Sequence, residues 1–265
     1  MSPEERWDLP ELRRQLARGL PGCSVELVES ITSTNSELMR GLRLGRQEKR
    51  LLIAEHQTAG RGRLGRQWID GPAKDNEAGG GDLLFSLCLP LANDHWAGLS
   101  LGLGVALADS LHADVKLKWP NDLWLGGRKL AGILIETTSL GDTRHVVLGV
   151  GINVAARGAA GWDPGPAWAQ EVLPGIAAPA LLQRVLPAVL LALQQFSASG
   201  LQPFLPGFAA RDLLHGRSVV MSDGTTGVAR GVDNDGALRV HTALGMKTII
   251  SSEVSVRPAA TDGRA

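Results

Sequence analysis

A stretch rich in glycine and arginine, Gly60–Trp68, carries the most informative chemistry in this sequence, and we call it the arginine loop. It reads Gly-Arg-Gly-Arg-Leu-Gly-Arg-Gln-Trp. Glycine lets a backbone turn tightly and approach a ligand closely. The planar guanidinium of arginine can bind two carboxylate or phosphate oxygens at once, and tryptophan can pack flat against a ring. The loop therefore predicts binding of a small anion attached to a flat group. A solvated basic loop without a ligand is disfavoured, because so much glycine with so much arginine makes a poor structural loop.

The glycines of this loop also have the G-x-G-x-x-G spacing of a dinucleotide-binding fingerprint, but their context argues against one. That fingerprint needs a strand directly before it and a helix directly after it. Here Glu55–Ala59 separates the loop from the apolar run 51–54, and Gly71-Pro72 follows too soon for a long helix. No glycine is followed by lysine anywhere in the chain, which excludes a Walker A motif.

Further polar clusters stand at the ends of predicted strands: Ser33-Thr34-Asn35, Trp119-Pro120-Asn121-Asp122, Arg128-Lys129, and Gln57 just before the arginine loop. Each cluster has an ordinary interpretation as a helix cap, a turn after proline or a solvated charge. Together they supply what acyl adenylation needs: cations for carboxylate and phosphate, an acid for Mg²⁺, and an aromatic for a ring. A lysine is a compact point charge, suited to a single reacting centre.

The composition is that of an ordinary globular protein without net charge. Of 265 residues, 44% are hydrophobic and 20% charged, which suits one large domain or a large and a small one. Lys and Arg number 27, as do Asp and Glu, so the chain is not built to coat nucleic acid or an acidic membrane. The basic residues instead cluster from Arg40 through Arg66, which favours a local anion pocket.

The sequence indicates a cytoplasmic protein. Cys23 and Cys88 cannot form a disulfide framework or a metal set, and their apolar surroundings predict buried free thiols. Residues 1–6 lack the basic start and apolar core of a signal peptide. No uncharged apolar run is long enough to cross a bilayer, so no membrane segment is expected.

Helices are predicted on both sides of the arginine loop. An amphipathic helix is expected over 8–20. Thr34 with Glu37 has the spacing of a capping box, which would begin a helix that runs to about Gly41. A nearly all-apolar helix is expected over 96–111, with glycines that suggest close packing.

The predicted strands favour a mixed sheet rather than a doubly wound one, because hairpins join most of them. Gly126-Gly127 marks one such hairpin. Pro90 should end the strand expected at 83–89. The strands are expected at 25–28, 51–55, 83–89, 115–119, 123–125, 130–136 and 145–154.

The remainder of the chain predicts two helices followed by a small β barrel. One helix is expected over 179–196, with Pro187 kinking or splitting it, and another over 204–212. We expect a mobile segment at 72–81 and a loop-rich stretch at 155–175. The barrel, of SH3-like size, has strands at 218–221, 226–232, 237–241 and 248–250. The predicted fold class is thus α+β, with an N-terminal helical segment (1–24), a catalytic domain (25–213), the barrel (216–258) and a disordered tail (259–265).

The motifs resemble, in order and spacing, those of the biotin–protein ligases, or biotin–[acetyl-CoA carboxylase] ligases. They are the arginine loop, Lys118–Asp122, Arg128–Glu136 and Gly149-x-Gly151-Ile152-Asn153. The resemblance covers about residues 25–258. It implies a fold like that of class II synthetases, and an enzyme that makes biotinyl-5′-adenylate from biotin and ATP. A lysine of a biotin carboxyl carrier domain would then accept the biotin. It also implies ATP with Mg²⁺ and no tightly bound prosthetic group.

The resemblance implies roles for individual residues as well. Biotin would be held by Ser33, Thr34, Asn35, Gln57, Gly60, Arg61, Arg63, Lys129 and Gly132. ATP or the adenylate would be held by Arg63, Arg66, Trp68, Asn121, Asp122 and Asn153. Lys129 would stabilise charge at the reacting oxygens, the arginines would close over the adenylate as a lid, and Asp122 would meet Mg²⁺. The catalytic residues would be Lys129, Arg63 and Asp122.

The sequence departs from the family pattern near the lid. Residues 72–80 are an insertion, Gly81-Asp82 stands where Gly and Asn are usual, and Leu89 replaces the Arg that often precedes the strand-ending proline. These differences concern the geometry of the lid rather than the reaction.

Other functions remain open on the sequence. A lipoate ligase or octanoyltransferase would keep the lysine but not the full arginine loop. A binding module would use only the barrel, and a biotin-dependent repressor would need an N-terminal DNA-binding domain. Because the segment before Cys23 is too short for that domain, we expect a monofunctional ligase without specific DNA binding. A homodimer is possible.

Overall fold

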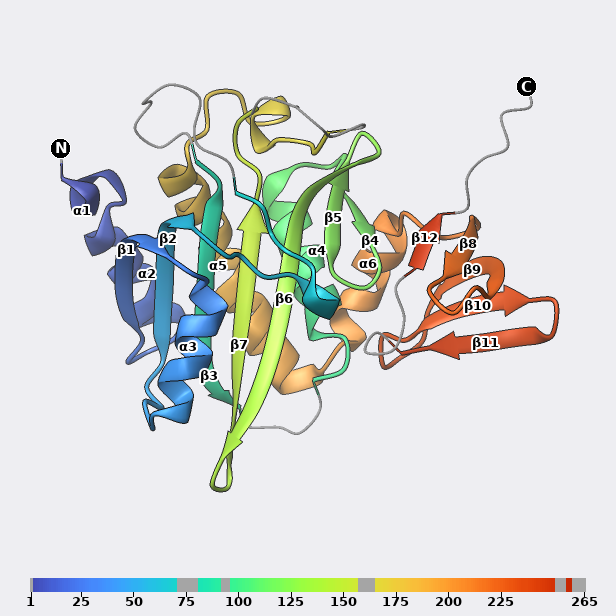
Figure 1. Cartoon of the computed structure of the whole chain (residues 1–265), viewed down its shortest axis with the longest axis horizontal. Coiled ribbons are helices and arrows are strands. Elements are labelled where there is room, and N and C mark those ends of the chain that lie inside the picture. Colours follow the sequence, from blue (N-terminus) through green and yellow to red (C-terminus); the bar gives the residue numbers. More distant parts are fainter. Residues whose placement is uncertain (1, 71–80, 92–95, 157–164, 251–255, 259–265) are drawn as a thin grey trace.

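The main body of the protein is a seven-stranded mixed sheet with helices on both faces (Figure 1). The computed structural model describes residues 2–70, 81–91, 96–156, 165–250 and 256–258. The strand order is β1-β2-β3-β7-β6-β5-β4. The strands are β1 (Ser24–Ile31), β2 (Arg50–Gln57), β3 (Leu83–Leu91), β4 (Lys116–Lys118), β5 (Asp122–Leu125), β6 (Arg128–Leu140) and β7 (Thr143–Ile152).

The sheet is mixed because one of its strand pairs is parallel and the others are antiparallel. β1 and β2 run in parallel, joined by the crossover helix α3 (Thr34–Arg43), whereas hairpins connect β4 to β5, β5 to β6 and β6 to β7. The predicted mixed sheet is therefore confirmed. The hairpin of β6 and β7 is longer than expected, and its register pairs Gly132 with Gly151.

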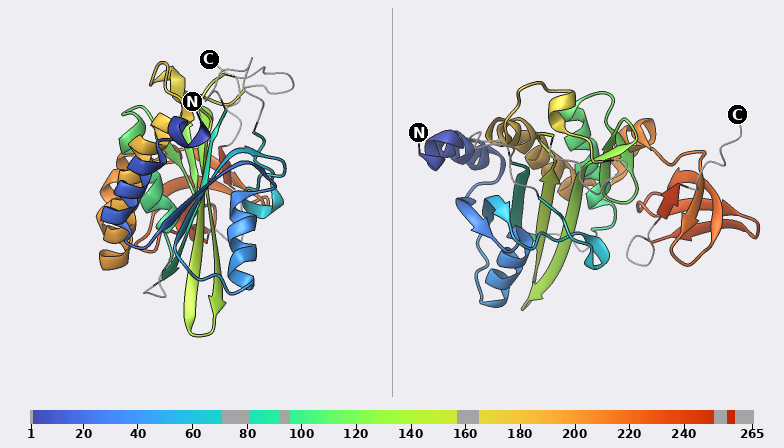
Figure 2. Two further views of the ribbon diagram at one scale, coloured as in Figure 1. Left: turned by 90° about the vertical axis from the view of Figure 1, so that its left-hand side faces the viewer. Right: turned by 45° about the horizontal axis from the view of Figure 1, so that its top comes forward.

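The helices divide unequally between the two faces. In the left view of Figure 2, α3 lies on one face, and the others pack together on the opposite face. That opposite layer contains α2 (Leu9–Gly19), α4 (Leu99–Leu111), α5 (Ala178–Ser199) and α6 (Leu205–Arg211). The large apolar core lies between this layer and the sheet, and a smaller cluster lies beneath α3. A further short helix, α1 (Pro3–Arg6), precedes α2.

Helix α4 is almost entirely buried, as its composition predicts. Close packing explains its glycines, because a Cβ at Gly102 would lie 3.2 Å from the Phe204 ring and one at Gly104 would lie 3.2 Å from Leu117. The helix begins at Leu99, after Gly98 with φ 81°. The prediction that it starts at residue 96 is therefore wrong by one turn.

The sequence predicts that Pro187 kinks or splits this helix, and the structure shows that α5 is not split. A proline inside a helix removes the hydrogen bond to the carbonyl four residues earlier. Here that carbonyl belongs to Gln183, and it accepts instead from the side chain of Gln15, on α2, with an N–O distance of 3.5 Å. The neighbouring helix thus partly replaces the lost bond.

Helix α5 is also long and apolar enough to cross a bilayer, judged by its 22 residues and composition alone. In the fold it packs against α4 and α2. Its apolar side chains, including Leu181, Val185 and Leu186, belong to the core. These contacts are typical of a core helix.

The C-terminal part forms a separate five-stranded antiparallel sheet beside α6 (Figure 1). Its strands are β8 (Ser218–Met221), β9 (Thr226–Val232), β10 (Leu238–Thr242), β11 (Gly245–Ile249) and β12 (Val256–Pro258). It meets the large sheet where the Trp119 Nε1–H donates to the carbonyl of Gly236, at 2.9 Å. β12 pairs with β8, inside the range 216–258 predicted for this part. Residues 259–265, like the segment 72–80, lie outside the described residues.

Two local predictions need correction. The N-cap of α3 is Ser33, whose Oγ accepts from Ser36 N, so Thr34 does not form the expected capping box. β3 continues through Pro90 to Leu91. Beyond Cys88 only β7 pairs with β3, so no strand lies on the β2 side that would need a hydrogen bond from the missing N–H of Pro90.

Candidate functional site

The arginine loop crosses the sheet as a closed hairpin. Gly62 N donates to Arg66 O at 2.7 Å, and Trp68 N donates to Gly60 O at 2.9 Å. A Cβ at Gly60 would lie 2.6 Å from the carbonyl oxygen of Trp68, so only glycine permits this closure. The tip is a short 3₁₀ turn in which Leu64 has φ 54°.

Asp70 fastens the far end of the loop to the strand from which the loop starts. Its Oδ2 accepts from the backbone N–H of Gln57 at 2.7 Å and lies 2.8 Å from Nδ1 of His56. The Asp70 side chain is only 6% exposed. Both ends of the loop are therefore held at the end of β2.

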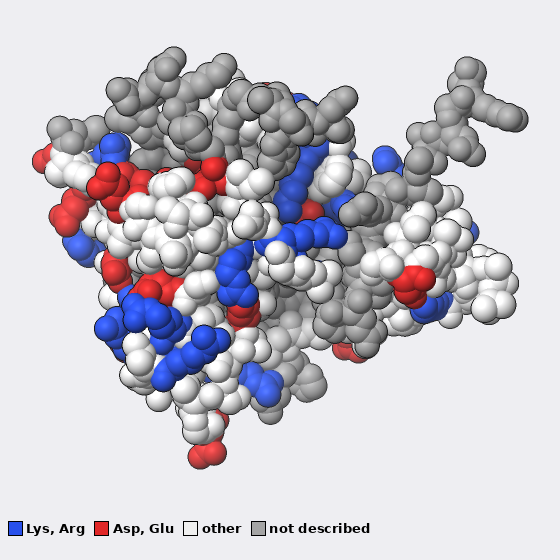
Figure 3. Space-filling view, in the orientation of Figure 1, with Lys and Arg blue, Asp and Glu red and all other residues white. Residues whose placement is uncertain are grey.

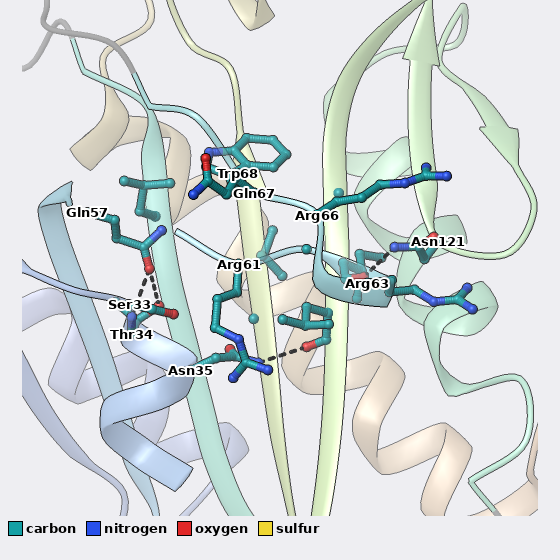
Figure 4. A pocket seen from close by; sticks show the side chains of 18 of the residues that line it. Ser33, Thr34, Asn35, Gln57, Arg61, Arg63, Arg66, Gln67, Trp68 and Asn121 are labelled. Carbon is teal, nitrogen blue, oxygen red and sulfur yellow. Dashed lines mark hydrogen bonds between the residues drawn. The ribbon is translucent and has the colours of Figure 1, made fainter. Parts of the chain in front are cut away.

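A pocket lies between this loop, the N-terminus of α3 and the middle of β6 and β7 (Figure 4). Most of the residues predicted from sequence line it. They are Ser33, Thr34, Asn35, Gln57, Arg61, Arg63, Arg66, Trp68, Asn121, Asp122, Lys129 and Gly132. Gly60 and Asn153 do not line it. Gly60 closes the hairpin instead, and Asn153 holds the backbone of Lys129, its Nδ2 donating to that carbonyl at 3.1 Å.

One end of the pocket is uncharged and rich in hydrogen-bonding groups. The Oε1 of Gln57 accepts from the backbone N–H of Thr34 at 2.8 Å, which fixes the glutamine amide at the start of α3 (Figure 4). Ser33, Thr34 and Gln57 are all less than 9% exposed. We call this the closed end.

Two glycines form the floor of the pocket below Trp68. A Cβ at Gly151 would lie 2.7 Å from Cε2 of the Trp68 ring. A Cβ at Gly132 would lie 3.2 Å from that ring and 3.2 Å from Nζ of Lys129. Because these glycines are cross-strand partners, together they leave a flat surface on which an aromatic ring can rest.

The other end is ionic. The Nζ of Lys129 lies 2.7 Å from Oδ1 of Asp122 and 5.6 Å from the centre of the Trp68 ring. Burial lowers the pKa of Arg63, an effect opposed by the charge of Asp122 and reinforced by that of Arg66. In Figure 3, basic side chains gather over the arginine loop near the centre of the face shown.

Backbone contacts aim these ionic side chains. Asn121 Nδ2 donates to Ile133 O at 2.7 Å, which ties the loop before β5 to β6. The register of β5 and β6 shifts by one residue next to Lys129. Such a bulge re-aims the side chains beside it.

Arg61 turns away from the ionic end. Its guanidinium pairs with Glu136 at 3.0 Å and donates to Oγ of Ser36 at 3.3 Å. Glu136 had no role predicted from the sequence beyond membership of a motif. Asp70 and Ser86 were missed as well, because neither stands in a polar cluster and only the folded contacts reveal them.

The chain matches the models of two protein families. Residues 27–153 match the model of the biotin/lipoate A/B protein ligase family, and residues 214–257 match that of the biotin protein ligase C-terminal domain. The chain is 36% identical to the bifunctional ligase/repressor BirA of Escherichia coli, over 97% of this chain and 83% of that protein.

Two further matches cover nearly the whole of the protein compared. A biotin–[acetyl-CoA-carboxylase] ligase of Paracoccus denitrificans is 32% identical over 84% of this chain and 96% of its own length. The structure of the R40G mutant of Aquifex aeolicus biotin protein ligase, in complex with biotin, superposes with a TM-score of 0.73 at 26% identity. That match covers 89% of this chain and 99% of the other.

Proposed function

This chain belongs to the biotin protein ligases, and we propose that it activates biotin with ATP and transfers it to a lysine of acetyl-CoA carboxylase. The first product is biotinyl-5′-adenylate, and the acceptor lysine lies on the biotin carrier domain. The names of its relatives supply the substrate and the acceptor, and the pocket supplies the chemistry.

One observation carries the proposal: the pocket has two chemically different ends. The closed end offers neutral hydrogen-bonding groups and the other end is ionic, and a floor of two glycines lies between them. The ureido ring of biotin, which has N–H and C=O groups, fits the closed end. Its carboxylate then extends toward the cations, where the phosphates of ATP also bind. The apolar tail of an octanoyl group would leave the closed end without hydrogen-bond partners.

In the first step a carboxylate oxygen of biotin attacks the α-phosphorus of ATP, and pyrophosphate leaves. Lys129 stabilises the negative charge that develops between the two reactants. Arg63 and Arg66 close over the adenylate and exclude water. Trp68 packs near the adenine, and Asn121 with Asp122 faces the phosphates.

In the second step the amine of the carrier lysine attacks the acyl carbon of the adenylate. AMP leaves with the electrons of the broken C–O bond, and the nitrogen loses a proton as the amide forms. Arg61 exchanges Glu136 for the carboxylate of biotin when the substrate enters. This exchange costs little, because the ion pair that Arg61 gives up is partly exposed to solvent.

Mg²⁺ is proposed to arrive with ATP rather than as a resident ion. Among the described residues no group of three or more His, Cys, Asp or Glu side chains converges on one point. A carboxylate oxygen suits Mg²⁺, and Asp122 is the acid at the ionic end. When bound, the ion neutralises phosphate charge.

Three properties stay predictions. We expect action in the cytoplasm and no specific DNA binding, and the candidate oligomer is a homodimer. The zero net charge supports weak affinity for nucleic acid. A gel-shift assay at physiological salt and sedimentation at several protein concentrations test the last two.

Intact-mass measurement of a biotin carrier domain tests the main proposal. The domain is incubated with the protein, biotin and Mg-ATP, and a parallel reaction omits ATP. An ATP-dependent gain of one biotinyl group on one lysine is expected. A gain with lipoate or octanoate but not biotin would reject the assignment, as would no gain with any of the three.

A further inference from the structure

The hydrogen bonds behind the closed end of the pocket form one continuous chain. It begins at Glu136 on β6, passes through Asn35 at the start of α3 and Ser86 in β3, and ends at Thr34. Ser86 is fully buried and does not line the pocket. It nevertheless contacts Asn35 and Thr34, which both line the pocket.

The carboxylate of Glu136 fixes which way the Asn35 amide points. The Nδ2 of Asn35 lies 3.0 Å from Oε2 of Glu136 and 3.3 Å from the carbonyl oxygen of Leu134. Both oxygens can only accept, so the donor side of the amide must face them. The Oδ1 of Asn35 therefore faces Ser86, at 2.6 Å from Oγ.

A glycine makes this arrangement possible. A Cβ on Gly149 would lie 2.2 Å from Oδ1 of Asn35 and 3.2 Å from Oγ of Ser86. Any side chain at position 149 would push the amide out of line.

The single hydrogen of each hydroxyl then has one possible place. Ser86 donates its hydrogen to Asn35, because Oδ1 of that amide can only accept. Thr34 Oγ1 lies 2.6 Å from Ser86 Oγ, so the hydrogen between these two oxygens must come from Thr34. The Oε1 of Gln57 lies farther from Thr34 Oγ1, at 3.1 Å, and already accepts from the Thr34 backbone N–H. If the Thr34 hydroxyl donated there, no hydrogen would lie between the two hydroxyl oxygens 2.6 Å apart. The Thr34 hydroxyl is left with its lone pairs to offer.

Gln57 completes a matched pair of groups. Because its Oε1 is held by the start of α3, its Nε2 donor is turned toward the pocket (Figure 4). The closed end thus presents an acceptor, Thr34 Oγ1, beside a donor, Gln57 Nε2. An N–H next to a C=O, as on the edge of a cyclic urea, is complementary to this pair.

We propose that Ser86 is a positioning residue that makes Thr34 a hydrogen-bond acceptor and so selects a ureido N–H of the substrate. The proposal rests on the proposed function, in which the ring of biotin occupies the closed end. Ser86 acts only through Thr34 and Asn35 and touches no reacting atom. A substrate without an N–H would leave the oriented acceptor unpaired, which costs affinity.

Calorimetric titration of the Ser86→Ala variant tests this role. Two ligands are compared. One is biotin, and the other is a biotin derivative with a methyl group on one of its two ureido nitrogens. Of the two such derivatives, we use the one that binds the wild-type protein more weakly. In the variant we expect biotin to bind about tenfold more weakly, and the penalty for methylation to shrink by a similar factor. The kcat at saturating biotin and the KM for ATP should stay within about twofold, because Ser86 is remote from the ionic end.

Cys88→Ala is the matched control. Cys88 is also buried, lies two residues along the same strand and faces the same helix, but it has no contact with the chain of hydrogen bonds. It should leave both affinities unchanged. An undiminished methylation penalty in Ser86→Ala would overturn the proposal, since a purely structural role would weaken both ligands equally.

Gly149→Ala provides a second test and carries the decision if Ser86→Ala does not fold. A Cβ at this position would lie 2.2 Å from Oδ1 of Asn35 and would displace the amide to which Ser86 donates. The same two ligands are compared. The methylation penalty should again shrink, and an unchanged penalty would contradict the proposal. If the wild-type protein neither binds nor transfers biotin, the proposed function itself is wrong.

Discussion

At the scale of single residues, cations of the site form ion pairs with acids and still remain partly exposed to solvent. Lys129 lies against Asp122, yet its side chain is 40% exposed. Its backbone is held separately, by Asn153. The charge of Lys129 can therefore be removed without disturbing the strand that carries it.

Lys129→Ala should lower the rate of adenylate formation by about 10²–10³-fold, because a preorganised charge at the reacting oxygens is lost. Pyrophosphate release measures this rate. The melting temperature should change little. Lys116→Ala, on the exposed side of β4, is the control and should leave the rate unaltered. Wild-type turnover in Lys129→Ala would remove this residue from the mechanism.

Arg63→Ala should weaken the lid, since Arg63 is the partly buried arginine of the loop tip and its pKa is lowered by that burial. Adenylate should escape and label lysines of bystander proteins. Mass spectrometry of serum albumin added to the reaction counts these labels. Arg14→Ala changes only a surface ion pair with Glu11 and should release no extra adenylate. Equal labelling by both variants would rule out the lid.

At the scale of elements, the arginine loop is held by contacts of different strength. Asp70 makes buried contacts at its far end, whereas the ion pair of Arg61 with Glu136 is half exposed and easily exchanged. We expect the tip to move when substrates bind while the two ends stay fixed.

Asp70→Ala removes the fixed contact and leaves the N–H of Gln57 without its acceptor. Loss of a buried hydrogen bond to a charged group costs about 1.5–3 kcal/mol. We expect faster amide hydrogen exchange across the arginine loop and a raised KM for biotin. Asp142→Ala, on the exposed turn between β6 and β7, should change neither quantity. Unchanged exchange in Asp70→Ala would show that the loop is anchored elsewhere.

At the scale of the whole molecule, two sheets are joined beside the pocket. The hydrogen bond from Trp119 to Gly236 connects the C-terminal sheet to the segment that carries Asn121 and Asp122. A Cβ on Gly236 would lie 3.0 Å from Gly98 and Leu101, so the contact is close along its length. The small sheet therefore supports the ionic end of the pocket.

The two free thiols predict how global stability changes in alkali. Cys88 is buried as the sequence predicts, whereas Cys23 is only partly buried. Burial raises the pKa of Cys23 from 9.0 to about 12 and that of Cys88 to about 11. The unfolded chain releases these protons near pH 9, and the folded protein retains them. The free energy of unfolding should therefore fall as the pH rises above 9 toward the folded pKa values. Urea titrations at pH 8 and pH 10 measure this, and a Cys23→Ala, Cys88→Ala double variant should show a smaller fall. An equal fall would assign it to other groups.

Much of the architecture followed from local patterns in the sequence. The hairpin at Gly126-Gly127, the apolar helix α4 and the short strands after Ser218 carry periodicity and turn residues that act within a few positions. The arginine loop and the polar clusters at strand ends were visible for the same reason, since residue type and spacing suffice to describe them. The mixed sheet followed from the hairpins.

Other features depended on partners distant in the chain. Pro187 stays within one helix, and Gln15, far away in sequence, partly replaces the hydrogen bond that the proline removes. Thr34 has the spacing of a cap, yet its hydroxyl turns to Ser86, and Ser33 caps the helix. Pro90 remains in β3 because the neighbouring strand has already ended.

The sequence by itself determined which residue types this protein brings to its reaction and the sheet that would carry them. The tertiary structure alone decided how those residues are oriented. Three examples depend on contacts between separate strands and helices. They are the direction in which the Thr34 hydroxyl donates its hydrogen, the anchoring of the arginine loop by Asp70, and the pairing of Arg61 with Glu136. Hydrogen bonds are directional and short, so they are fixed only when folding brings their partners within about 3 Å.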